Sequence, residues 1–178
     1  QGSLLASKLL GRLLVDEGYD VKVSEVHGMS QRGGSVVTYV RFGDKVYSPL
    51  VEEGEADFIV SFEKLEAARW ASCLKEGGRI IVNDRETDPM PVITGACEYP
   101  EALPEKIKEA GVDVICADVL SLAEKAGSSK AVNVVLLGVF AKMIGIDPAL
   151  FNDAIDSLVK EKFRDLNKVA FELGYSVK

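Results

Sequence analysis

Residues Asp57–Asp84 read DFIVSFEKLEAARWASCLKEGGRIIVND, and this stretch decides the fold class. It opens with an apolar run, Phe58-Ile59-Val60, which is typical of a strand buried on both faces. A helical pattern follows over Glu63–Leu74, and Gly77-Gly78 is expected to close that helix. A second apolar run, Ile80-Ile81-Val82, predicts another buried strand. Buried strands that alternate with helices predict a mostly parallel sheet.

The alternation continues on both sides of this stretch. Upstream, the pattern predicts an amphipathic helix that Gly18 ends, two strands, and a hairpin around Gly43-Asp44 with a short return strand: Ser3–Val15, Val21–Val26, Ser35–Phe42 and Lys45–Ser48. Downstream, it predicts an edge strand, a helix, a strand, and four more helices, the last of which Gly174 stops: Val92-Ile93, Pro104–Ala110, Val112–Cys116, Ala117–Ala126, Lys130–Ile144, Ala149–Val159 and Glu161–Leu173. We therefore predict a single α/β domain over residues 1–178. It has three layers (α/β/α), a mostly parallel but mixed sheet of Rossmann-like type, and a helical C-terminal cluster.

Composition and charge narrow the class of function. The chain has 178 residues and a formal net charge of -7. An acidic surface argues against nucleic-acid binding, which needs a basic face to neutralise phosphates. No apolar run approaches the ~20 residues that span a bilayer, so we expect no membrane association. No signal peptide is visible, and a cytoplasmic location is therefore expected.

The cysteines and the missing motifs bound the chemistry. Cys73, Cys97 and Cys116 are far apart and odd in number, which suits neither a disulfide framework nor a metal cluster. The sequence contains no complete dinucleotide-binding glycine motif after a strand and no P-loop lysine motif. We therefore predict no cofactor in this chain, no metal ligand and no catalytic residue.

A glycine-rich segment follows the strand Val21–Val26. It reads HGMSQRGG, and ligands in an open α/β sheet bind beyond the carboxyl ends of strands, where such a loop is expected. Glycines let the backbone approach something bulky, and the Arg32 guanidinium can grip a carboxylate or a phosphate. A plain connection with a solvated arginine explains the composition equally well. The candidate ligand- or interface-binding residues here are His27, Gly28, Ser30, Gln31, Arg32, Gly33 and Gly34.

Three other features are candidates for the same site. His27 is the only histidine, and an interface or structural role is favoured over general-base chemistry because no carboxylate partner can be assigned. Gln1-Gly2 opens a helix whose free N–H groups would suit an anion. Asn133 lies within an apolar helix and needs partners there. A structural bond to a neighbouring loop is favoured for Asn133 over lining a site.

Residues Val23–Trp70 closely resemble the gamma-type domain of the 2-oxoacid:ferredoxin oxidoreductases, and the block GMSQRGG is the most specific part of the match. Two further blocks support it: LKEGGRIIVND, Leu74–Asp84, and NVVLLG, Asn133–Gly138. Within the family the chain is most similar to indolepyruvate-type members, and the similarity extends over nearly its whole length. The family begins with a strand and a Gly-Gly-Gln-Gly turn. Gln1-Gly2 matches the end of that turn, so the resemblance implies that the opening strand and first glycines precede Gln1.

The resemblance implies a division of labour between subunits. A large (alpha) subunit would carry thiamine diphosphate, Mg and iron–sulfur clusters. It would convert arylpyruvates to aryl-acetyl-CoA by oxidative decarboxylation, with CoA as co-substrate, and pass the electrons to ferredoxin. The small subunit would be inactive alone, and His27–Gly34 would form one wall of a shared active centre. A pyruvate- or 2-oxoglutarate-specific relative is the alternative within the family.

Two other functions stay open on the residues alone. One is an autonomous nucleotide- or CoA-binding module that uses the Gln1-Gly2 turn and Arg32. The other is an interaction protein whose helical cluster, Lys130–Leu173, buries apolar surface against a partner or in a homodimer.

Overall fold

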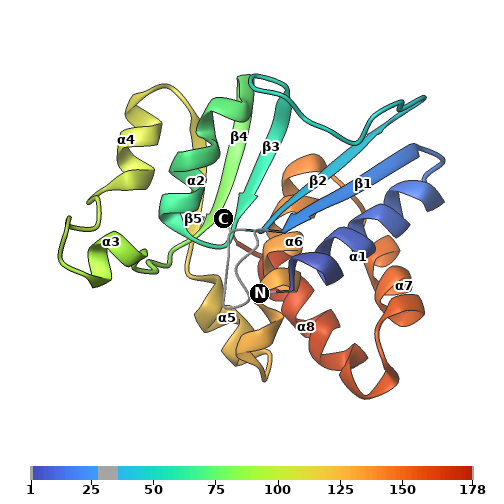
Figure 1. Ribbon diagram of the computed structural model, residues 1–178. Helices are drawn as coiled ribbons and strands as arrows, with labels where there is room; N and C mark the ends of the chain where they lie inside the picture. The colour runs from blue at the N-terminus through green and yellow to red at the C-terminus, as the bar shows by residue number, and fades with distance from the viewer. Residues whose placement is uncertain (1, 28–35, 178) are drawn as a thin grey trace.

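A parallel three-stranded sheet organises the chain, with the strands in the order β3-β4-β5 (Figure 1). The computed structural model describes residues 2–27 and 36–177. Its strands are β1 (Asp20–His27), β2 (Val36–Gly43), β3 (Ala56–Ser61), β4 (Leu74–Asn83) and β5 (Asp113–Ala117). Its α-helices are α1 (Ser3–Asp16), α2 (Lys64–Trp70), α3 (Met90–Ile93), α4 (Leu103–Glu109), α5 (Val119–Lys125), α6 (Val132–Ile144), α7 (Pro148–Leu158) and α8 (Arg164–Tyr175).

Helices cover both faces of the parallel sheet, so its strands are apolar on both sides. On β4, Ile80 and Val82 pack with Ala67 of α2 on one face, while Ile81 joins the larger core around α6 on the other. Phe58 of β3 meets Phe140 of α6 edge to face, with ring centroids 5.3 Å apart. The predicted three-layer α/β/α arrangement with a helical C-terminal cluster is confirmed.

The antiparallel part of the fold differs from the predicted hairpin. β1 and β2 pair with each other over eight positions, from Asp20↔Gly43 to His27↔Val36, and form a separate two-stranded sheet. The predicted return strand Lys45–Ser48 is wrong, because that segment forms no strand. The Val46 amide instead donates to the Asp20 carboxylate at 2.9 Å, which fixes this segment beside the start of β1.

Other local predictions are also wrong, because contacts with other parts of the chain decide the conformation of these segments. The helix predicted over Glu63–Leu74 ends early, because α2 gives way to a 3₁₀ turn and β4 already begins at Leu74. Gly77-Gly78 therefore lies in an irregularity of β4, where pairing with β3 shifts register. The predicted edge strand Val92-Ile93 belongs to α3. Gly174, predicted to stop the last helix, lies inside α8.

Helix α6 is the centre of the larger core. Every residue from Asn133 to Ala141 is buried, as expected for a helix that is apolar on all sides. α8 crosses it closely at two glycines. A Cβ added at Gly138 would lie 2.7 Å from the Tyr175 amide nitrogen, and one added at Gly174 would lie 2.8 Å from the Val135 carbonyl carbon. The two backbones can meet only because neither residue has a side chain.

No helix within residues 2–27 and 36–177 combines the length and the apolar character that crossing a bilayer requires.

Replacing Gly138 by alanine is expected to destabilise the chain strongly. The new Cβ meets the backbone of α8, which cannot move without repacking the core, so the cost is about 3 kcal/mol or more in free energy of unfolding. Denaturant titration of both variants measures it. Gly11→Ala is the matched control, since its Cβ would contact only a Val23 methyl at 3.7 Å. That helical change should stabilise by about 0.5–1 kcal/mol. Equal effects at both positions would contradict the close crossing.

Candidate functional site

The N-terminus of α1 lies against the start of α6. Gly2 precedes the helix with φ +82° and ψ 19°, a left-handed conformation that glycine adopts without strain. Its carbonyl accepts from the Leu5 and Ala6 amides, both at 3.1 Å. No side-chain cap satisfies the first turn within the described residues. A Cβ at Gly2 would lie 2.7 Å from the Asn133 amide nitrogen, so only glycine fits.

Asn133 joins these two helices. Its side chain is 2% exposed, and its Nδ2 donates to the Gly2 carbonyl at 3.0 Å. Its Oδ1 is buried and receives no hydrogen bond from a described residue. Buried amide oxygens normally have a donor, and this one lies on the side chain that contacts the N-terminal turn of α1. The favoured structural bond between Asn133 and a neighbouring segment is thus present, and the pair Gly2–Asn133 forms the described part of the candidate site.

The rest of the predicted site falls largely outside the described residues. The predicted site residues that lie outside are Gln1, Gly28, Ser30, Gln31, Arg32, Gly33 and Gly34, and their roles stay predictions. His27 ends β1 and pairs in register with Val36, the first residue of β2. The backbone on each side of the glycine-rich segment is therefore fixed at adjacent positions of one ribbon.

The carboxyl ends of the parallel strands point toward the side of the molecule where α1 begins (Figure 1). Asn83 ends β4, is 1% exposed, and holds two neighbours: its Nδ2 donates to the Phe62 carbonyl at 3.3 Å, and its Oδ1 accepts from the Val119 amide at 3.3 Å. It thereby ties the loop after β3 to the first residue of α5. This is the sheet edge at which α/β proteins bind ligands.

A second polar cluster lies at the same edge, and sequence reasoning missed it. Glu63 directly precedes α2, and its side chain is buried. Its carboxylate caps α2 by accepting from the Glu66 amide at 2.8 Å, and it accepts from the Tyr99 hydroxyl, 36 positions away. The Tyr99 oxygen in turn accepts from the Leu65 amide at 3.1 Å. Nothing in local sequence marks a contact between such distant residues.

The pKa values of Tyr99 in this cluster and of the adjacent Lys64 are both raised by their surroundings. Burial, and then the hydrogen bond to the Glu63 carboxylate, raise the pKa of Tyr99 above its ordinary value of 10.0. Hydrogen bonds to Asp84 and Glu86, at 2.8 and 2.9 Å, raise the pKa of Lys64. Tyr99 therefore stays a neutral donor and Lys64 a cation, so neither suits a proton-transfer role near neutral pH.

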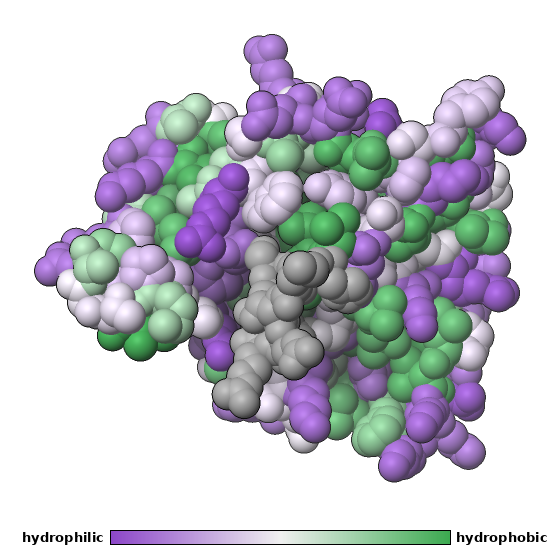
Figure 2. Space-filling view, viewed as in Figure 1, coloured by the Kyte–Doolittle hydropathy of each residue, from purple (hydrophilic) through white to green (hydrophobic). Residues whose placement is uncertain are grey.

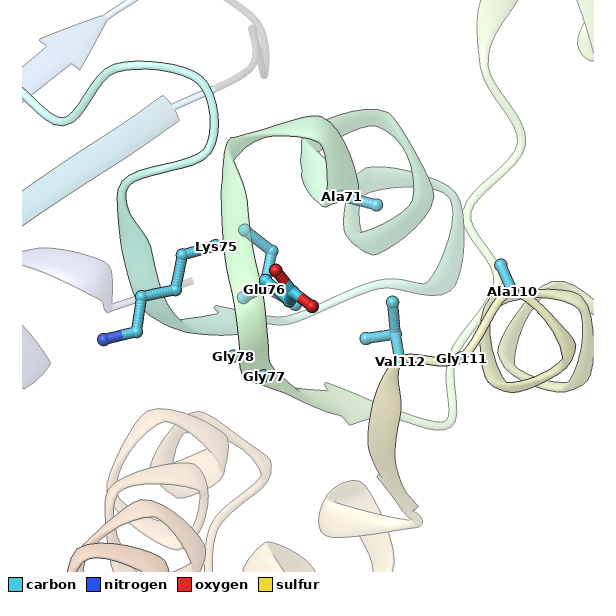
Figure 3. A pocket seen from close by; sticks show the side chains of 9 residues that line it. Ala71, Lys75, Glu76, Gly77, Gly78, Ala110, Gly111 and Val112 are labelled. Atoms are coloured by element: carbon cyan, nitrogen blue, oxygen red, sulfur yellow. The ribbon is translucent and has the colours of Figure 1, made fainter.

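A shallow cavity lies at the opposite edge of the sheet and does not fit a ligand site. Its volume is about 240 Å³, and Figure 3 shows its lining at the amino ends of β4 and β5. Glu76 is the carboxylate in this view, while the Lys75 side chain points away and pairs with Asp57. The remaining lining is small or apolar: Ala71, Leu74, Gly77, Gly78, Ala110, Gly111 and Val112. Ligands of parallel sheets bind at the other end.

The described residues do not form a metal centre. Among residues 2–27 and 36–177, no group of three or more histidine, cysteine, aspartate or glutamate side chains is placed to hold an ion. Cys73, Cys97 and Cys116 are free thiols.

Comparison with known proteins places this arrangement in a family. Residues 1–177 match the family model described as pyruvate ferredoxin/flavodoxin oxidoreductase. The chain belongs to this family. It is 42% identical to the indolepyruvate oxidoreductase subunit IorB of Thermococcus kodakarensis, over 98% of this chain and 89% of that protein. It is 37% identical to the same subunit of Archaeoglobus fulgidus, over 99% of this chain and 89% of that protein.

Solved structures share the fold at lower identity. The gamma subunit of a keto/oxoacid ferredoxin oxidoreductase from Geobacter sulfurreducens PCA matches with a TM-score of 0.70 at 21% identity, covering 98% of this chain and 89% of that one. The 2-oxoglutarate:ferredoxin oxidoreductase of Magnetococcus marinus matches with a TM-score of 0.74 at 17% identity, covering 98% of this chain and 28% of that one. The same fold therefore occurs both in a subunit of similar length and within a much longer chain.

Asn133→Ala is expected to loosen the N-terminal turn of α1. Loss of the bond to the Gly2 carbonyl should lower the free energy of unfolding by about 1–2 kcal/mol. It should also speed hydrogen exchange of amides in residues 3–7, measured by mass spectrometry. Asn167→Ala is the control, because the buried Asn167 amide donates only within its own helical segment, to Phe163. Unchanged exchange at α1 in Asn133→Ala would contradict the bridge.

Stability at alkaline pH should depend on Tyr99. Its pKa is raised in the folded chain, so its contribution is complete below pH 10.0 and is lost as pH rises through the folded value. The free energy of unfolding should therefore fall more steeply above about pH 10 in the wild type than in Tyr99→Phe. Tyr47, which is 89% exposed, provides the control substitution. If the free energy of unfolding fell equally with pH in the wild type and in Tyr99→Phe, the raised pKa of Tyr99 would be contradicted.

Proposed function

We propose that this chain is the small subunit of an indolepyruvate-type 2-oxoacid:ferredoxin oxidoreductase. In the assembled enzyme it supports CoA-dependent oxidative decarboxylation of arylpyruvates to aryl-acetyl-CoA, with electrons passing to ferredoxin. The observation that carries the proposal is near-full-length similarity, at 42% identity, to a protein named as an indolepyruvate oxidoreductase subunit. Two relatives named for ketoisovalerate are less similar, at 27% and 28% identity.

The chemistry is assigned to the large subunit. Thiamine diphosphate, Mg and the iron–sulfur clusters are expected there. This assignment follows from the resemblance to the family, and the three cysteines of this chain are far apart in sequence, whereas an iron–sulfur cluster needs grouped thiolates. We propose that this chain meets the shared centre at the sheet edge where β3 and β4 end, beside the start of α1 (Figure 1).

The residues of this chain would shape the approach to that centre. The Gly2–Asn133 pair sets the position of the first turn of α1, whose amides point out of the helix N-terminus. A helix N-terminus favours negative charge, such as the phosphates of CoA or the carboxylate of a 2-oxoacid. Arg32 and its neighbours in the glycine-rich segment are proposed to form the facing wall.

A second candidate function is CoA binding by this chain alone. It is favoured by the buried Asn133 Oδ1, which no described residue satisfies, next to a helix start that has no side-chain cap. The two candidates differ in what the isolated chain does. The subunit hypothesis requires the large partner for any turnover, whereas the module would bind CoA without it.

Reconstitution tests the proposed function. We expect the isolated chain to reduce no dye with indolepyruvate and CoA, and the addition of the large subunit to give ferredoxin reduction. Activity should exceed that of the large subunit alone, because the shared centre is then complete. Turnover by the isolated chain would overturn the proposal.

The variant Arg32→Ala provides a second test in the same assay. It should lower the activity of the assembled enzyme without changing the melting temperature of the small subunit, while Arg12→Ala, an exposed residue paired with Asp16 on α1, serves as the control. Calorimetry of the isolated chain with CoA separates the two candidates. Micromolar binding that Arg32→Ala abolishes would favour the autonomous module.

A further inference from the structure

Residues 84–102 connect β4 to α4 as a projecting segment, which we call the acidic arm. All of its residues except Pro89, Val92 and Tyr99 are exposed. The helix α3 lies in its middle and is held by its own bonds, such as the Thr94 hydroxyl to the Met90 carbonyl at 2.9 Å. Met90 and Ile93 of this helix are 65% and 64% exposed. The arm thus presents large apolar side chains that its own fold does not bury.

Both ends of the arm are held by one turn at the start of α2. At the beginning of the arm, the Lys64 ammonium pairs with Asp84 and Glu86, and the Lys64 amide donates to the Arg85 carbonyl at 3.0 Å. At the end of the arm, the Tyr99 hydroxyl donates to the buried Glu63 carboxylate. The ends are fixed while the middle projects, so a partner would bind an already ordered surface and lose less conformational entropy.

The arm also concentrates negative charge. It contains five carboxylates and one guanidinium, a net charge of -4 out of the chain's -7. Three of the carboxylates, those of Asp88, Glu98 and Glu101, form no ion pair with another described residue. In Figure 2 the lobe at the lower left, where Figure 1 places α3, shows apolar surface beside polar surface.

We propose that the acidic arm is a docking element for the large catalytic subunit, and that Met90 and Ile93 enter an apolar groove bordered by lysine and arginine side chains. The inference rests on the proposed function. Charge argues against two other occupants. A second copy meeting arm to arm would bring two acidic segments together, and an anionic surface such as nucleic acid or an acidic membrane would be repelled in the same way.

The position of the arm fits a shared active centre. It leaves the sheet directly after Asn83, at the carboxyl end of β4, which is the edge that the candidate site occupies. A partner that grips the arm is therefore brought to the edge where α5 and α1 begin. Docking and completion of the centre would use adjacent surfaces.

Binding of the purified chain to the purified large subunit, measured by calorimetry at several salt concentrations, tests the inference. Met90→Ser/Ile93→Ser should raise the Kd about tenfold or more, as expected for apolar anchors. Asp88→Lys/Glu98→Lys should raise the Kd about tenfold at low salt and flatten its salt dependence. The controls lie on α8: Val169→Ser, whose side chain is 44% exposed, and Glu172→Lys.

The outcomes separate the two proposals. Weakened binding in both arm variants, with unchanged melting temperatures and with controls that bind like the wild type, supports the docking role. Wild-type binding that the arm variants leave within twofold overturns the docking role and leaves the proposed function standing. A wild-type chain that does not bind the large subunit overturns the proposed function itself, and the docking inference with it.

Discussion

The contact between the backbones of α6 and α8 is the constraint on which the rest of the structure depends. Gly138 and Gly174 let the two helices approach until a single added carbon would strike the opposite main chain. This approach encloses α6 so fully that nine consecutive residues are buried. Because interiors are packed to near-crystalline density, such a contact tolerates little adjustment. One face of the parallel sheet therefore packs on α6, and α8 fixes the position of α6.

Helix α6 also connects the core to the edge of the sheet where α1 begins. Phe140 lies against β3, and Asn133, two turns earlier, holds the carbonyl of Gly2. The start of α1 is thus placed by a residue of the core rather than by its own capping side chains. Asn83 likewise holds the first residue of α5 from the end of β4, and there the Asp118 side chain also caps the helix by accepting from the Ser121 amide. Two helix starts at one sheet edge are therefore set by buried amides, which suits a rigid wall to which another subunit adds the reacting groups.

The elements that could be predicted are those whose signal is local and strong. Phe58–Val60 and Ile80–Val82 are continuous apolar runs, and both form strands of the parallel sheet. Ile80–Val82 is buried on both faces as expected, whereas Val60 of β3 is exposed. The amphipathic pattern of Ser3–Val15 gave α1 to within a residue at its end. Short signals failed where neighbours decide the conformation. Val92-Ile93 is β-branched and apolar like a strand, yet it follows Pro89 into a helical turn in an exposed arm that pairs with no strand.

The other failures share a physical reason, which is that distant contacts leave no local trace. Gly174 has the composition of a helix stop, but its missing side chain serves the contact with Val135. The pairing of β1 with β2 across the glycine-rich segment could not be distinguished from a hairpin at Gly43-Asp44, because both strands alternate suitably. At the candidate site, Asn133 was found because a polar residue in an apolar helix is unusual. The Glu63–Tyr99 contact joins residues that are ordinary in their own surroundings.

The burial of α6 has a consequence for how the chain is made. Synthesis proceeds from the N-terminus, and the helix that closes over Gly138 is α8, which follows all the other described elements. Until Gly174 has left the ribosome, the uncovered side of α6 remains an apolar surface facing water. Unfinished chains of this kind are prone to aggregate and are typical clients of chaperones. The tight crossing that gives the subunit its rigid interior therefore also makes the folding of this core wait for α8.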